Sequence, residues 1–410
     1  MTIEVGRSGR RPSDRKAQLT DAAAELFRLR GYHGVSVNDI AAAAGVTGPA
    51  VYRHFGGKQD MLAHVLFAGL DRFAEVADTA LDSGADNPDA VIAKLTGGLS
   101  ALAVQRREVT ALWRWQGLHL EKAERRKIRG RAAEIMGRWV LALRDARPEL
   151  AEPDATLLAW AALSVFGSVA DHHVRLPRRR FERKLCDMAN AVLRAQPHPA
   201  EVEESASDRT GWQVDANPPS RREELLSQAT ALFRDRGYHA VSMEDIGAQA
   251  GIAGPSIYRY FSGKAEILMA AGYRMADRLT IAADRAVESA SDPEDALTKL
   301  VRSYVDIVLR SDNLMMLYTD PVVDLPDRDA RELCRLQRSY VARWVRLLSE
   351  VSPKLDTPAA RITVHAALTI VNDLGRTPRV TSRPGVVDEL TTLAITVLRT
   401  GSLAEPANDK

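Results

Sequence analysis

Apolar residues recur along this chain with the spacing of amphipathic helices. One stripe has apolar residues three and four positions apart, and a matching stripe follows in the other half of the chain. The first comprises Ala22, Ala23, Leu26, Phe27 and Leu29, and the second comprises Leu225, Leu226, Ala229, Leu232 and Phe233. This spacing places the apolar side chains on one face of a helix. No segment alternates convincingly between apolar and polar residues as a half-buried strand does, so we predict an all-α fold.

Capping signals divide the N-terminal pattern into short helices. Ser36 followed by Asp39 fits an N-terminal capping box. Gly45 then ends a short helix, and Gly48 opens another with Pro49 in its first turn. The same signals return at Ser242, Asp245, Gly251, Gly254 and Pro255. The helices expected from these signals are 37–44 and 48–55, with copies at 243–250 and 254–261.

Helical periodicity continues through the rest of each half. The further helices expected in the first half are 90–104, 107–120, 131–144, 154–171 and 181–193. Those expected in the second half are 295–309, 331–350, 358–373 and 386–398.

The chain repeats itself at about half its length of 410 residues. Leu26–Leu62 and Leu232–Leu268 are identical at 22 of 37 positions, and a weaker resemblance continues to the end of each half. This period is too long for a solenoid unit and indicates two tandem domains. Prolines and acidic residues mark a solvated linker between them. The expected division is a basic arm at 1–13, a DNA-binding domain at 14–62, a helical body at 63–195, the linker at 196–219, a second DNA-binding domain at 220–268, a second body at 269–402 and a tail at 403–410.

Two short helices joined by a tight turn form the helix-turn-helix geometry, whose second helix enters the major groove of DNA. Ile40, Val46, Val51 and Phe55 are expected to form its small core. Arg53 then faces outward, and arginine is the commonest bidentate reader of guanine. The residues predicted to contact DNA are Thr47, Gly48, Pro49, Ala50, Tyr52, Arg53, His54 and Lys58 in the first copy, and Gly254, Pro255, Ser256, Tyr258, Arg259, Tyr260 and Lys264 in the second.

A tyrosine and a lysine in each copy are suited to the DNA backbone. Tyr52 can donate a hydrogen bond to a phosphate, and Lys58 begins a helix, where free backbone N–H groups favour an anion. A P-loop is excluded because no glycine stands five residues before Gly57 and neither Ser nor Thr follows Lys58. The alternative is that Tyr52 and Tyr258 are core aromatics of a small bundle. Their recurrence with a lysine six residues later favours DNA contact.

The segments 14–62 and 220–268 resemble the N-terminal signature of TetR-family transcriptional regulators. The shared pattern is Gly-Tyr-His-x-Val-Ser-x-x-Asp-Ile-x-x-x-Ala-Gly-x-x-x-Pro-x-x-Tyr-Arg-x-Phe-x-x-Lys, and it occurs twice. The resemblance implies a three-helix DNA-binding head on a helical body that binds ligand and dimerises. It also implies that the matched tyrosines and lysines touch phosphates. The double unit is similar to tandem TetR-type repressors of mycobacteria and related actinobacteria, which include regulators of lipid-import genes of the mammalian-cell-entry type.

Basic residues precede each copy of this signature. Arg10 and Arg11 stand before the first, and Arg221 stands before the second. An arm that reaches the adjacent DNA groove is one interpretation. A solvated charged tail is the other, because such tails are common.

The first body is rich in aromatic residues. In the family this region encloses an effector cavity, so the resemblance implies a small apolar or amphipathic effector. An ordinary helical core with capping histidines is the alternative. The predicted ligand-binding residues are Trp113, Trp115, His119, Trp160 and Phe166. Because the second body carries different aromatics, we expect the two bodies to bind ligand unequally.

Composition narrows the remaining possibilities. The formal net charge is only +2, so a DNA-binding surface must be a local patch. Cys186 and Cys334 form no CxxC pair, and the adjacent His172 and His173 diverge on a helix, so we expect no metal and no cofactor. No apolar run of about 18 residues and no signal peptide are evident. These features predict a cytoplasmic protein.

These observations together predict a sequence-specific repressor that binds a double-stranded DNA operator. Its two non-identical heads predict an asymmetric operator read by one chain acting as a pseudo-dimer, and a small lipophilic effector would release it. A transcriptional activator with the same DNA-binding mode remains open. An enzyme is disfavoured because G-x-S-x-G, H-E-x-x-H and G-x-G-x-x-G are all absent. A non-specific nucleoid binder is disfavoured by the low net charge.

Overall fold

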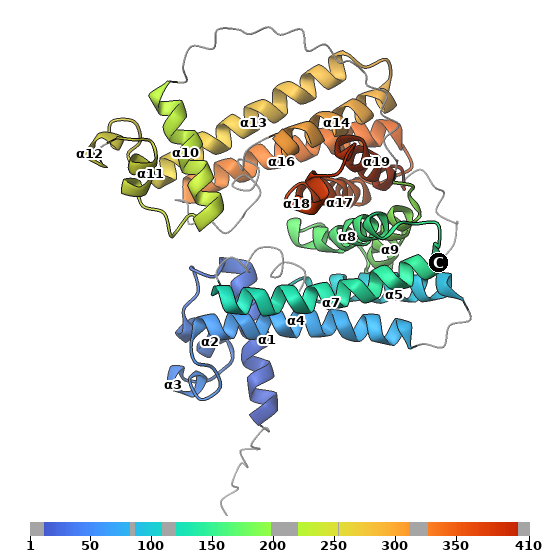
Figure 1. Ribbon diagram of the computed structural model, residues 1–410, viewed down its shortest axis with the longest axis horizontal. Coiled ribbons are helices and arrows are strands. Elements are labelled where there is room, and N and C mark those ends of the chain that lie inside the picture. Colours follow the sequence, from blue (N-terminus) through green and yellow to red (C-terminus); the bar gives the residue numbers. More distant parts are fainter. Residues whose placement is uncertain are drawn as a thin grey trace, which may run out of the picture.

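The structure is a computed structural model, which describes residues 12–82, 87–108, 120–197, 220–252, 254–310 and 327–400. Within these ranges the chain is helical and contains no β-strand, so the predicted all-α class is confirmed (Figure 1). The helices form two units of the same design, one after the other along the chain.

The first unit consists of a small head followed by a body of longer helices. The head helices are α1 (Pro12–Arg30), α2 (Val37–Ala43) and α3 (Gly48–Val51). The body helices are α4 (Lys58–Leu81), α5 (Pro88–Gln105), α7 (Lys122–Ala146), α8 (Glu152–Gly167), the short 3₁₀ helix η2 (Ser168–Asp171) and α9 (Arg178–Arg194).

The second unit repeats this plan. Its head helices are α10 (Arg221–Arg236), α11 (Met243–Gln249) and α12 (Gly254–Ile257). Its body helices are α13 (Lys264–Glu288), α14 (Pro293–Arg310), α16 (Asp327–Val351), α17 (Thr357–Leu374), α18 (Pro378–Thr381) and α19 (Val386–Arg399). Helices α5 and α14 both have 18 residues and α7 and α16 both have 25, so the duplication extends well beyond the heads.

Two expectations about the helices need correction, and one helix was not expected. The second helix of each head ends at Val51 or Ile257, four residues earlier than expected, because the chain turns there with His54 N and Phe55 N both donating to Val51 O. The expected helix 154–171 divides after Gly167, where η2 begins. Helix α18 was not expected. Most of the expected helix 107–120 lies outside the described residues.

The two units pack against each other through the last helices of their bodies. Helix α8 lies along α17, and α9 lies along α19, so these four helices stand between the two units (Figure 1). Small residues allow the helices to approach closely, and Ala159, Ala162 and Ala366 are fully buried.

Polar contacts also cross this interface. Thr369 Oγ1 donates to Asp171 Oδ2 at 2.7 Å, and Arg180 pairs with Asp356 at 2.6 Å. The rings of His172 and His365 lie 5.0 Å apart between their centroids. His172 is buried and His365 is half-buried, and desolvation is the main cause that lowers the pKa of each, to about 4 for His365. Both histidines are therefore neutral at physiological pH.

An arginine beside α18 ties the units together at one end of the interface. Arg383 donates to Asp154 on α8 and also to Glu389 on α19. Glu389 is almost fully buried, and its bond to Arg383 is the first cause of the raised pKa of that guanidinium. The buried carboxylate is thus neutralised by an arginine that also reaches the other unit.

By length and composition alone, residues Glu152–Asp171 are apolar enough to cross a membrane, although no apolar run of about 18 residues was evident in the sequence. However, 72% of that window is buried inside the protein. It comprises α8 and η2, which pack on α17. The apolar character of this segment is therefore accounted for by its position in the interface between the units.

Candidate nucleic-acid interface

Each head contains the capping box that the sequence predicted. Asp39 N donates to Ser36 Oγ at 3.1 Å, and Ser36 N donates in return to Asp39 Oδ2 at 2.8 Å. Hydrogen bonds from Ser36 hold the pKa of Asp39 below its usual value. Ser242 and Asp245 form the same pair in the second head. The starts of α2 and α11 are therefore fixed by residues that are close in sequence.

The turn between the two short helices depends on glycine. Gly45 has φ +65° and Gly251 has φ +66°, a left-handed conformation that side chains with a Cβ disfavour. Gly48 lies close to α2, since a Cβ there would lie 2.5 Å from Asn38 Oδ1 and the Asn38 side chain would have to move. These glycines allow α2 and α3 to pack closely at the angle of a helix-turn-helix.

The apolar residues of the first head face inward, and the residues predicted to contact DNA bases face outward. Ile40, Val51 and Phe55 are buried in one hydrophobic cluster, with Val46 packed at its edge. Tyr52 is 60% exposed, and its counterpart Tyr258 is 52% exposed. The alternative that these tyrosines are core aromatics is therefore wrong. Their contact with phosphate remains a prediction.

The other predicted DNA-contacting residues lie on the same short segments. Arg53 and Arg259 are exposed and form no ion pair with any residue in the described part of the chain. Thr47, Pro49 and Tyr260 are exposed, and Gly48, Ala50, His54 and Ser256 are half-buried. Gly254 and Pro255 open α12. Arg10 and Arg11 lie outside the described residues.

Lys58 and Lys264 make a second set of contacts that the sequence analysis did not anticipate. Lys58 Nζ donates to Val35 O at 2.8 Å and lies 4.3 Å from the centroid of the Tyr32 ring. Lys264 Nζ donates to Tyr238 O at 2.8 Å and lies over that tyrosine's ring. Burial lowers the pKa of both lysines. Each ammonium therefore links the start of α4 or α13 to the loop that precedes α2 or α11.

The basic residues before each head also have structural contacts. Lys16 lies over the ring of Phe55, and Arg222, 206 positions later, lies over the ring of Phe261. Arg221 pairs with Glu224 one helical turn away. For Arg221 the sequence predicted only an arm or a solvated tail. The repeated spacing of 206 was the signal that could have identified the cation–π pairs.

The two heads lie at the same end of the molecule (Figure 1) and touch through their first loops. The rings of His33 and His239 are 4.0 Å apart between centroids. Both belong to the repeated Gly-Tyr-His motif. The motif was visible in the sequence, but contact between its two copies depends on how the bodies pack.

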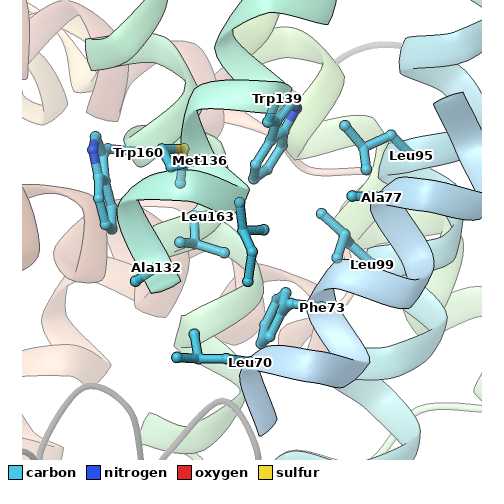
Figure 2. Close-up of a pocket in the computed structure, with 11 residues that line it drawn as sticks. Leu70, Phe73, Ala77, Leu95, Leu99, Ala132, Met136, Trp139, Trp160 and Leu163 are labelled. Atoms are coloured by element: carbon cyan, nitrogen blue, oxygen red, sulfur yellow. The ribbon is translucent and has the colours of Figure 1, made fainter. Parts of the chain in front are cut away.

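The first body encloses an apolar cavity between α4, α5, α7 and α8 (Figure 2). The empty space between the atoms at this site, with open solvent at its mouth included, is about 470 Å³, and the part that a water-sized molecule can occupy is much smaller. The lining residues are Leu70, Phe73, Ala77, Leu95, Leu99, Ala132, Ile135, Met136, Trp139, Trp160 and Leu163.

The predicted ligand-binding residues relate to this cavity in different ways. Trp160 lines it. Phe166 is buried and stacks behind Trp139 at 6.4 Å, outside the lining. Trp113, Trp115 and His119 lie outside the described residues. The lining residues on α4 and α5 were not predictable from the sequence, because an apolar residue beside a cavity has the same pattern as one in a filled core.

Known proteins share the heads of this chain. The family model described as "Bacterial regulatory proteins, tetR family" matches residues 19–65 and again residues 225–271. These two ranges contain the two capping boxes and the two glycine turns described above.

Curated relatives extend the similarity into a body. The transcriptional activator FasR of Mycolicibacterium smegmatis is 30% identical over 157 residues, which are 37% of this chain and 68% of FasR. The transcriptional repressor KstR2 of the same organism is 29% identical over 138 residues, which are 33% of this chain and 66% of KstR2. The solved structure of KstR2 from Mycobacterium tuberculosis matches with a TM-score of 0.39 and 23% identity, covering 44% of this chain and 95% of that one.

The relatives with these names are transcriptional regulators that bind DNA through a helix-turn-helix. The family pattern occurs in both halves of this chain, and each occurrence folds into a head with the same caps, turn and exposed tyrosine. The chain is therefore a DNA-binding transcriptional regulator that belongs to the TetR family and carries the family's DNA-binding unit twice.

Proposed function

We propose that one chain does the work of a regulator dimer, as a repressor that binds an asymmetric operator and is released by an apolar or amphipathic effector. The observation that carries the proposal is the difference between the two outward surfaces. Ala50 is replaced by Ser256 and His54 by Tyr260 at equivalent positions. A twofold dimer reads a palindrome because its recognition helices are identical. Two different helices favour two different half-sites.

The internal interface supports the single-chain part of this proposal. The helix faces of α8 and α17 are already buried against each other within the chain. Arg383 and Arg180 add ion pairs that cross between the units. A second chain would have to displace these contacts to use the same helices. The internal pairing also keeps the second head at a high effective concentration near DNA.

The cavity of the first body supports release by an effector. Its lining is apolar, which suits a molecule with a hydrocarbon part. To release DNA, such a molecule must bind better to an arrangement of the heads that does not fit the operator. A tenfold loss of operator affinity requires a difference of about 1.4 kcal/mol.

Selection of bound DNA from a random library, followed by mass measurement of the complex, tests the proposal. We expect two unequal half-sites about one helical turn apart and one chain on the minimal operator. Operators made symmetrical from either half-site should bind more weakly than the selected one. Two chains on one minimal operator, or equal affinity for a symmetrised site, would contradict the proposal.

The alternative of an activator with the same DNA-binding mode is favoured by one finding, namely that FasR is named an activator. A reporter gene under the selected operator separates the two possibilities in the cell that carries this chain. Deletion of the chain should raise expression of the reporter if the chain represses, and should lower expression if it activates.

In either case we propose that the chain acts in the cytoplasm, where its operator is accessible.

A further inference from the structure

The duplication allows the two bodies to be compared position by position. Trp139 on α7 corresponds to Trp344 on α16, 205 positions later. The same offset relates the first residues of α5 and α14, Pro88 and Pro293. Every cavity-lining residue on α5, α7 and α8 therefore has a defined counterpart in the second body.

The counterparts of two aliphatic lining residues are tyrosines. Tyr304 stands at the position of Leu99, and Tyr340 stands at the position of Ile135. Both tyrosines are buried, and their rings lie 6.1 Å apart between centroids. Each also packs against Trp344, at 5.6 Å and 6.1 Å. The second body thus has a contiguous aromatic cluster where the first has a cavity wall.

A buried hydrogen bond holds this cluster in position. Tyr304 Oη donates to Asn372 Oδ1 at 2.9 Å. Asn372 corresponds to Gly167 of the first body, which has no side chain to accept such a bond. Tyr304 and its hydrogen-bond partner Asn372 therefore both occur only in the second unit. Other counterparts are smaller than the residues that line the first cavity. Ala276 and Leu279 stand 206 positions after Leu70 and Phe73, the offset that relates Lys58 to Lys264, and Val341 and His365 stand 205 positions after Met136 and Trp160.

The chemistry of the first cavity restricts what it can hold. Its lining consists of aliphatic and aromatic side chains and the thioether of Met136. Figure 2 shows the indole nitrogens of Trp139 and Trp160 on the sides of the rings away from the cavity. Among the described residues, no side chain that lines the cavity is charged. An ionised group placed there would lose its hydration without gaining a partner.

We infer that the chain senses ligand through its first body alone, where a neutral apolar molecule binds in the cavity, and that Tyr304 and Tyr340 close the equivalent site of the second body. This inference rests on the proposed function for its regulatory meaning. Helix α8 lines the cavity with Trp160 and Leu163 and packs against α17 on its other side. A ligand that shifts α8 therefore acts directly on the interface that sets how the two heads are placed.

Titration with N-phenyl-1-naphthylamine, a neutral apolar fluorophore, tests the inference on the full chain without DNA. We expect the unaltered protein to bind one equivalent. Replacing Leu99 and Ile135 together by tyrosine should weaken that binding at least tenfold. The reciprocal variant, Tyr304→Leu with Tyr340→Ile and Asn372→Ala, should bind a second equivalent. Asn372→Ala is included because the amide would otherwise lose its hydrogen-bond donor.

Controls separate closure of the cavity from loss of folding. Tyr304→Phe keeps the ring and removes the hydroxyl, so it should still bind one equivalent. Thermal unfolding reports whether each variant is folded, and the variant that opens the second body tests the idea even if the tyrosines in the first are not tolerated. Two equivalents bound by the unaltered protein, none bound by it, or only one bound by the opened variant would each overturn the inference.

The same experiments keep the inference distinct from the proposed function. Operator binding is measured without the fluorophore, and fluorophore binding is measured without the operator. If the chain selects no operator, the proposed function fails, while the number of fluorophore sites still reports on the two bodies. If it selects an asymmetric operator and binds fluorophore in both bodies, only the inference fails.

Discussion

At the scale of single residues, the two head lysines combine a structural and a predicted DNA-binding role. One N–H of the Lys58 ammonium is used by Val35 O, and its charge lies over the ring of Tyr32. An ammonium has three donors, so this arrangement leaves capacity for a phosphate. The contact across 23 positions between Lys58 and Val35 was not predictable from sequence spacing.

Lys58→Ala should therefore weaken binding to many DNA sequences alike, since phosphates carry no base information. Loss of one ionic contact should also reduce the slope of log K against log salt by about one. Affinities measured over a range of salt concentrations check this. Lys354→Ala, at an exposed position in the turn after α16, should leave the slope unchanged. A changed sequence preference in the Lys58 variant would contradict the assigned role.

Arg53→Ala and Arg259→Ala should behave differently, because arginine reads base edges. Each substitution should cost about 1–3 kcal/mol on the selected operator. Each should also relax the preference at particular base pairs, and the two variants should affect different half-sites. A comparison of binding to all single-base changes of the operator provides the measurement. A uniform loss over all sequences would instead mean that these arginines contact only the backbone.

At the scale of elements, the helix-turn-helix was predictable and the cavity was not. Capping by Ser36 and the turn at Gly45 are local signals, so the bounds of α2 were expected to within one residue. The end of α3 at Val51 was missed because its apolar pattern continues to Phe55, which packs in the core without being helical. The cavity wall comes from four helices. The position of the cavity depends on how these four helices pack, and the periodicity of the sequence carries no information about that packing.

Gly45→Ala should destabilise the first head by about 1–2 kcal/mol, because it forces a residue with a Cβ into the left-handed region. Operator affinity should fall with it, since the turn orients α3. Gly137→Ala is the matched control, as Gly137 is an exposed residue of α7 with open space around a new Cβ. That change should stabilise by about 0.5–1 kcal/mol. Denaturant unfolding of both variants checks the opposite signs.

At the scale of the whole molecule, the interface between the units should make stability depend on pH. His365 faces Asp171, which favours its protonation, and Arg361, which opposes it, but burial dominates and lowers its pKa to about 4. His172 faces His365, Arg107, His173 and Arg361, all of which oppose protonation. The unfolded chain binds these protons near pH 6.5. The stability that these neutral histidines contribute is therefore present above about pH 6.5 and is lost as the pH falls towards 4.

For His365 alone, lowering the pH from 7 to 5 should reduce the free energy of unfolding by about 2 kcal/mol. Denaturant unfolding at the two pH values measures this loss. His365→Leu should show a smaller loss over the same interval. His64→Gln, at a half-exposed position on α4, serves as the comparison and should retain the loss. An unchanged pH dependence in the His365 variant would show that other groups are responsible.

The covalent joining of the two units has a consequence for how such a protein changes over generations. In a regulator built from two copies of one chain, every mutation appears twice, and a residue on the twofold axis must pack against itself. Here a mutation in α8 leaves α17 unchanged, so Trp160 and its counterpart His365 have diverged without any requirement to match. Because the two units need not stay identical, the first unit can keep a binding site while the second unit changes into a packed support for it.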